Sequence, residues 1–211
     1  MPTVTKNLII INVLCFLAQV LLEQRDVSLT MYGGLTFFLS DYFMPHQLLT
    51  YMFLHGSISH LFFNMFAVFM FGRTLEMVWG PKRFLFYYLI VGIGAGLMQE
   101  VVWTFSLWDY LSDPQIGQVK WITIGASGAV FGILLAFGMM FPNAELIMLP
   151  IPIPVKAKWF VIGYGLLELV LGVANISGDP VAHFAHLGGL LFGLVIILYW
   201  KKQNRTNGRF Y

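Results

Sequence analysis

Charged residues are scarce in this chain of 211 residues. Only 10% of them are Asp, Glu, Lys or Arg, whereas soluble domains carry about 25%. This shortage excludes an ordinary soluble domain. The chain is instead 58% hydrophobic and has a mean hydropathy of +0.77, which is typical of a polytopic membrane protein.

The cysteine count and the net charge are also low, and each excludes some classes of function. The single cysteine, Cys15, lies in an apolar run, so an internal disulfide and most thiolate metal sites are excluded. The net charge of +2 is too small to indicate a nucleic-acid partner. With spans of about 20 residues, the length allows six or seven helices and no separate soluble domain.

We predict an all-α polytopic membrane protein, with one membrane domain over residues 1–211 and six transmembrane helices. The second helix begins between Leu48 and Gly56, and the first is no signal peptide because no small-x-small cleavage site follows it. The predicted spans are about 7–22, 52–72, 84–103, 124–141, 158–174 and 182–200, followed by a cytoplasmic tail at 201–211.

The positions of the basic residues indicate the orientation. If both termini are cytoplasmic, ten of the twelve basic residues lie on the cytoplasmic side and only Arg25 and Lys120 lie outside. The positive-inside rule expects this asymmetry, which a seven-span topology would lose. The asymmetry and the small core favour a bacterial inner membrane. The ten are Lys6, Arg73, Lys82, Arg83, Lys156, Lys158, Lys201, Lys202, Arg205 and Arg209.

Two outer loops are unusual. The first, about 23–47, is long and rich in aromatic residues, so we expect it to lie in the membrane interface. The second, 175–181, is short and polar, and we expect it to form a movable cap above His186.

A serine and a histidine begin two different apolar stretches. Ser127 follows Gly125-Ala126 near the start of one stretch, and His186 lies near the start of another. A polar side chain in lipid must be matched, or it costs free energy. A serine hydroxyl becomes a useful nucleophile when a base lies within hydrogen-bond reach. The two residues therefore predict a serine hydrolase whose site is recessed into the bilayer.

Small residues predict that these two helices touch. Gly128 and Gly132 on one helix, and Gly189 and Gly193 on the other, form two small-xxx-small faces. Such faces allow close approach of helix backbones in a membrane. Their contact would bring Ser127 beside His186.

Other polar side chains are candidates for stabilising the oxyanion. His60 and Asn64 are four residues apart, on one face of the second helix. They could donate hydrogen bonds to the oxyanion, together with the amides at the start of the Ser127 helix. We expect no intramembrane Asp to orient His186, so the site would be a dyad, with Phe131 stacked on the imidazole.

In this order, the motifs carry a family resemblance over about residues 46–200. They are Phe53-Leu-His55, His60-Leu-Phe-Phe-Asn64-Met65, Gly125-Ala-Ser127-Gly128, the Pro150-Ile-Pro152-Ile-Pro154 turn with Lys156, and Ala185-His186-Leu-Gly-Gly189. The chain resembles the rhomboid intramembrane serine proteases.

The resemblance implies a nucleophile at Ser127 and a general base at His186. It also implies His60, Asn64 and the Ser127 amide at the oxyanion, and substrates that are single-span membrane proteins unwound near the outer membrane face. Gly125, Gly128, Phe131, Gly189 and His183 are expected to support the site.

The chain departs from the family at two points. It has His46-Gln47 where many members have Trp-Arg or Trp-Gln, so anchoring of the first outer loop is open. It has Phe131 where Tyr is frequent, which keeps ring stacking but removes a hydroxyl.

Two other hypotheses stay open: a metal site of His60, His183 and His186, and a non-catalytic membrane protein that binds clients. We expect no metal or organic cofactor for the chemistry. His55 and His183 could instead bond a loop carbonyl or water, and Glu168 could lie shallow enough to reach water. Glu76, near Arg73, is expected to be a structural partner.

Overall fold

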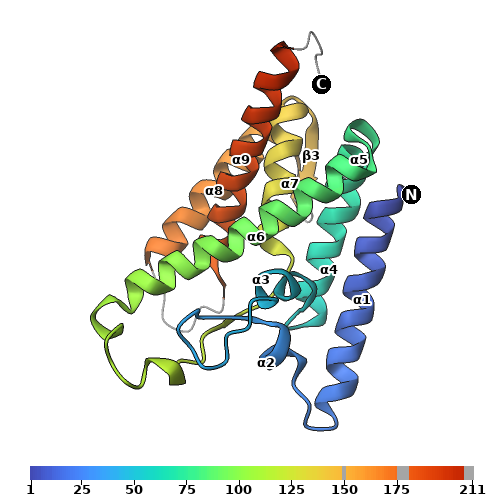
Figure 1. The fold of residues 1–211 in the computed structure, drawn as a ribbon. Helices are drawn as coiled ribbons and strands as arrows, with labels where there is room; N and C mark the ends of the chain where they lie inside the picture. The colour runs from blue at the N-terminus through green and yellow to red at the C-terminus, as the bar shows by residue number, and fades with distance from the viewer. Residues whose placement is uncertain (149–150, 175–180, 207–211) are drawn as a thin grey trace.

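The computed structural model describes residues 1–148, 151–174 and 181–206. Five of its helical stretches are long and apolar enough to cross a membrane, and a sixth apolar helix is shorter. The chain is therefore an integral multi-pass membrane protein with a bundle of six helices, as predicted (Figure 1). The stretches are α1 (Thr3–Glu23), Ile58–Trp79, α6 (Pro81–Ser106), the short α7 (Ser127–Met140), α8 (Ala157–Ala174) and α9 (His183–Thr206).

The second span differs from its predicted limits of 52–72. It starts at Ile58 because Ser57 caps it, with the Ser57 hydroxyl accepting from the His60 amide at 3.1 Å. Tyr51 and Met52 precede it, buried in the core. The span ends at Trp79, where Gly80 adopts a φ of +80°. Its parts are α4 (Ile58–Ala67), a π-helical turn η2 (Val68–Gly72) and α5 (Arg73–Trp79), and α3 (Gln47–Thr50) and η1 (Tyr51–Phe53) come before it.

The predicted contact between the two glycine faces is present at the centre of the bundle. A Cβ added to Gly189 would lie 1.9 Å from the carbonyl oxygen of Gly128, so α7 and α9 touch through their backbones. Tyr87 of α6 reinforces this centre, because its hydroxyl donates to the Gly132 carbonyl at 2.7 Å. These contacts hold the first residues of α7 against α9.

The start of α1 and the end of α9 lie at one end of the bundle, as an even number of spans requires (Figure 1). The starts of α7 and α9, which carry Ser127 and His186, lie at the other end. The last helix is longer than predicted: α9 continues to Thr206, so most of the expected tail at 201–211 is helical.

The long first loop folds under the end that carries Ser127. It contains α2 (Leu29–Gly33) and β1 (Leu35–Thr36), which pairs antiparallel with β2 (Ile122–Thr123). Gln47 anchors this loop: its Oε1 accepts from the Thr36 hydroxyl at 2.8 Å, and its Nε2 donates to the Tyr42 carbonyl at 3.0 Å. The 3₁₀ turns η3 (Trp108–Tyr110) and η4 (Ile116–Gln118) lie in the connection between α6 and β2.

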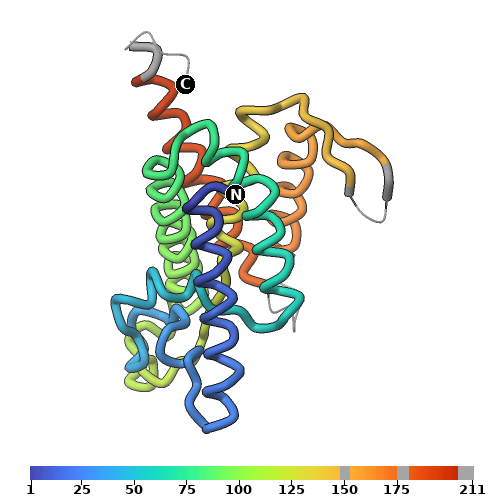
Figure 2. The backbone as a smooth tube through the Cα atoms, turned by 90° about the vertical axis from the view of Figure 1, so that its right-hand side faces the viewer, coloured from blue at the N-terminus to red at the C-terminus, as the bar shows by residue number. Residues whose placement is uncertain are grey.

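The connection between α7 and α8 is a hairpin where we predicted a turn. Strands β3 (Glu145–Met148) and β4 (Ile151–Lys156) pair antiparallel and project from the side of the bundle (Figure 2). The predicted cap at 175–181 falls almost wholly outside the described residues, which resume at Val181.

The N-terminal helix is attached through polar side chains. Thr5, Asn12 and Gln19 are buried at intervals of seven residues, on one face of α1. Glu76 accepts from the amides of Val4 and Thr5 at 2.8 and 2.7 Å, and also from the Thr5 hydroxyl at 2.7 Å. Glu76 is thus a structural residue, as expected, and its partners are the first turn of α1.

Candidate active site

Ser127 is the first residue of α7, and the preceding glycine makes that position possible. Gly125 has a φ of +128°, a conformation that residues with a side chain rarely adopt. Its amide donates to the Tyr51 carbonyl at 2.9 Å, which fixes the turn to the loop before α4. The first amides of a helix have no partner in a preceding turn. The Ser127 amide therefore lies beside its own hydroxyl as an available donor.

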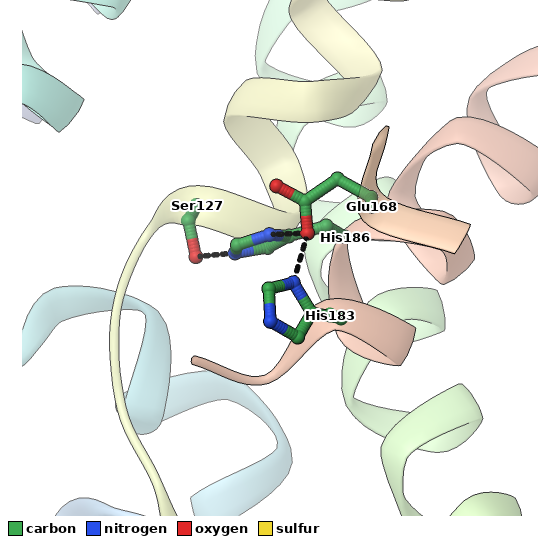
Figure 3. A network of polar contacts seen from close by, with 4 residues as sticks. All are labelled: Ser127, Glu168, His183 and His186. Carbon is green, nitrogen blue, oxygen red and sulfur yellow. Dashed lines mark hydrogen bonds and ion pairs between the residues drawn. The ribbon is translucent and has the colours of Figure 1, made fainter. Parts of the chain in front are cut away.

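His186 lies in the first turn of α9, with its Nε2 2.7 Å from the Ser127 hydroxyl (Figure 3). On its other side, Nδ1 lies 2.9 Å from Oε2 of Glu168. An ionised carboxylate can only accept hydrogen bonds. Nδ1 therefore carries the proton, and Nε2 presents its lone pair to Ser127.

We expected no intramembrane Asp beside His186, but a glutamate, Glu168, lies there. It extends from α8 and is only 4% exposed, so it does not reach water as proposed above. Its Oε2 also accepts from Nδ1 of His183 at 2.6 Å (Figure 3). The prediction of a dyad considered only an intramembrane Asp in this role and gave Glu168 no place in the site. A glutamate inside an apolar stretch needs a polar partner, and that requirement was the available signal.

Aromatic rings support the imidazole, as the spacing of Phe131 predicts. The Phe131 ring stacks on His186 with centroids 4.3 Å apart and planes 12° apart. Tyr164 of α8 stacks on Phe131 at 5.0 Å, a contact that the sequence reasoning did not find. One face of the His186 ring is thus packed against the Phe131 ring, which restricts the orientation of the imidazole.

His60 and Asn64 lie on α4, beside the loop that carries Ser127. The Gly56 amide donates to Nδ1 of His60 at 3.4 Å, so the neutral ring has its proton on Nε2. A Cβ on Gly125 would lie 2.7 Å from that Nε2, which places it against the serine turn. Nδ2 of Asn64 is buried and has no hydrogen-bond partner among the described residues. Two side-chain donors are thus available here.

The remaining histidines differ from one another. His55 is buried, packs edge-on against His60 with centroids 5.0 Å apart, and has neither ring nitrogen bonded within the described part of the chain. Burial lowers the pKa of His55 to about 4, so its ring is neutral. His46 lies outside the site, where its Nε2 is 3.0 Å from the Tyr32 carbonyl.

The metal hypothesis combined His60, His183 and His186. Within residues 1–148, 151–174 and 181–206, the group whose ligand atoms come within 4.8 Å of one another is Glu168, His183 and His186. His60 belongs to no such group there. The hydrogen bonds of Glu168 already account for the approach of the two imidazoles.

Comparison with known proteins gives a consistent picture. The Rhomboid domain family matches residues 42–203. Rhomboid protease AarA of Providencia stuartii is 30% identical over 91% of this chain and 70% of its own length. Rhomboid protein 1, mitochondrial, of Saccharomyces cerevisiae is 31% identical over 71% of this chain and 40% of its own length. RHOMBOID-like protein 12, mitochondrial, of Arabidopsis thaliana is 30% identical over 78% of this chain and 48% of its own length, so the chain spans less than half of these last two.

Proposed function

The chain belongs to the rhomboid family, and we propose that it is an intramembrane serine endopeptidase that cleaves transmembrane segments of membrane proteins. One observation carries the proposal. The Ser127 hydroxyl lies 2.7 Å from Nε2 of His186, whose Nδ1 is bonded to a buried carboxylate. This arrangement suits removal of a proton from the hydroxyl.

In the proposed reaction, Nε2 of His186 takes the Ser127 proton while Oγ attacks the scissile carbonyl carbon. The tetrahedral intermediate then collapses, and the imidazolium returns the proton to the leaving amine. Water hydrolyses the acyl-enzyme by the same two steps, with His186 again as base and then as acid. No metal or organic cofactor takes part in these steps.

The oxyanion would be held by Nε2–H of His60, Nδ2–H of Asn64 and the Ser127 amide. Nδ2 of Asn64 has no hydrogen-bond partner in the described part of the chain, and this supports the assignment, because buried donors in proteins are normally bonded. A role in binding the oxyanion, whose negative charge forms only during the reaction, would explain why this donor is unbonded. Loss of one such donor typically lowers turnover by about 100-fold or more.

The length of α7 supports a site below the membrane surface. Its 14 residues measure about 21 Å, whereas the hydrocarbon core is about 30 Å thick. If its far end lies at the cytoplasmic face, Ser127 lies within the outer half of the bilayer. We propose single-span membrane proteins as substrates, and a bacterial inner membrane with both termini cytoplasmic as the location.

We place lateral substrate access between α4 and α8. Both helices contact α7, and both present large apolar side chains outward, among them Phe62 and Phe63 of α4 and Leu166 and Val170 of α8. A transmembrane substrate would meet these surfaces before it reached Ser127.

A fluorophosphonate probe tests the proposal on the full chain in detergent. We expect the wild-type protein to be labelled. Ser127→Ala and His186→Ala should lose both labelling and cleavage of a membrane substrate, while their thermal stability should be almost unchanged. Ser106→Ala is the matched control, since the Ser106 hydroxyl donates to the Val102 carbonyl of its own helix. Absence of labelling and cleavage in folded wild type would favour a non-catalytic client-binding protein. Inhibition by a chelator that zinc reverses would revive the metal hypothesis.

A further inference from the structure

Glu168 occupies an unusual position for a carboxylate. On α8, Ala157 and Glu168 are the buried residues, while neighbours such as Leu167 and Leu169 are exposed at the apolar surface of the bundle. A charged side chain buried in a membrane protein is costly unless it is paired and hydrogen-bonded. Glu168 meets that condition through one oxygen, which accepts from two imidazoles at 2.6 and 2.9 Å.

The proton positions follow from this sharing. Because Oε2 accepts from Nδ1 of both His183 and His186, each ring has its proton at Nδ1 and the carboxylate has none. The lone pair of His186 then lies on Nε2, toward Ser127. Without the carboxylate, the His186 proton could move to Nε2. A ring protonated there cannot take the serine proton.

We propose that Glu168 is a positioning residue that completes a Ser127–His186–Glu168 triad, with His183 holding the carboxylate in place. The inference rests on the proposed function. Because Glu168 extends from α8 and both imidazoles from α9, the base is correctly oriented only while α8 is packed on α9. The position of α8 thereby controls the nucleophile.

The test compares Glu168→Gln with wild type in two measurements on the full chain. In serine-protease triads, changing the orienting carboxylate to its amide lowers kcat by about 10⁴-fold, so we expect a loss of at least about 100-fold in kcat and in probe labelling, with KM little changed. ¹⁵N NMR of histidine-labelled protein should show His186 protonated at Nδ1 in wild type and at Nε2 in Glu168→Gln. A merely structural role for Glu168 would not move this proton.

Two further variants control the comparison. Glu100→Gln removes another buried carboxylate, on α6, which accepts from the Phe38 amide of the first loop, and we expect it to leave kcat near that of wild type. Glu168→Asp keeps the charge, and we expect intermediate turnover with His186 still protonated at Nδ1. If Glu168→Gln does not fold, the Asp variant carries the test.

A double variant tests whether His183 acts through Glu168. We expect His183→Ala to lower kcat less than Glu168→Gln does, and the double variant to be no slower than Glu168→Gln alone.

Wild-type turnover and an unchanged tautomer in Glu168→Gln would overturn the inference, as would an equal loss in Glu100→Gln. Failure of the proposed function is distinguishable, because an inactive and unlabelled wild type would still report its His186 tautomer.

Discussion

Replacing Gly189 by alanine should disconnect Ser127 from His186. The new Cβ would lie 1.9 Å from the Gly128 carbonyl oxygen, whereas side-chain carbons do not approach other atoms closer than 3.0 Å. The backbones of α7 and α9 must therefore separate by about 1 Å. A misplacement of about 1 Å can cost about 100-fold in rate, and overpacking costs about 1–3 kcal/mol of stability.

Rates of fluorophosphonate labelling and thermal unfolding in detergent measure these two effects. Gly163→Ala is the matched control: a Cβ there meets nothing within 4 Å, so labelling and stability should be unchanged. Labelling of Gly189→Ala at the wild-type rate would refute the reasoning, because it would show that backbone contact between α7 and α9 does not set the distance from serine to base.

Three other substitutions test separate parts of the structure. Asn64→Ala should slow turnover by about 100-fold with KM nearly unchanged in steady-state assays, and an unchanged kcat would remove Asn64 from the oxyanion site. Glu76→Gln should lower the free energy of unfolding by about 1–3 kcal/mol, since it weakens three hydrogen bonds to the start of α1, and Tm in detergent measures this. The pKa of His55 in the folded chain is about 4, below its ordinary value of 6.5. Between these two pH values the unfolded chain binds more protons than the folded chain, so Tm should fall as the pH drops from 6.5 to 4. His55→Phe should lose less Tm over that range, and an equal loss would mean that other groups cause it.

The central contact of the fold was predictable from the sequence because regularly spaced glycines in a membrane helix indicate close packing against another helix. Gly128, Gly132, Gly189 and Gly193 occur at spacings that produce continuous faces, and in a membrane such faces pack together. The structure has them in contact through α7 and α9. The approach of Ser127 to His186 follows directly from this packing.

The limits of the second span were not predictable from hydropathy. Tyr51 and Met52 fit the hydrophobic pattern of a span. In the structure they belong to a 3₁₀ turn that precedes the helix, and both side chains are buried in the core. At the other end, Arg73 and Glu76 suggest a boundary, yet the helix continues to Trp79. Glu76 is tolerated because the amides of Val4 and Thr5 on α1 donate hydrogen bonds to it, and these contacts depend on tertiary structure.

Glu168 shows what sequence reasoning lacked at the site. Its position inside an apolar stretch indicated a need for a partner, but the partner depends on how α8 is rotated against α9. Hydropathy gives no such rotation. Only the folded chain shows that the buried face of α8 carries this carboxylate toward two imidazoles.

The polar face of α1 has a practical consequence for work with the purified protein. Thr5 and Gln19 join α1 to the rest of the bundle by hydrogen bonds to Glu76 and to the backbone of His55, and a large part of the helix is otherwise exposed. Hydrogen bonds are strong where water is absent and weaken where it competes. A micelle of short-chain detergent admits more water than a bilayer, so α1 should be the first helix to detach on extraction, and the choice of detergent should decide whether it is retained.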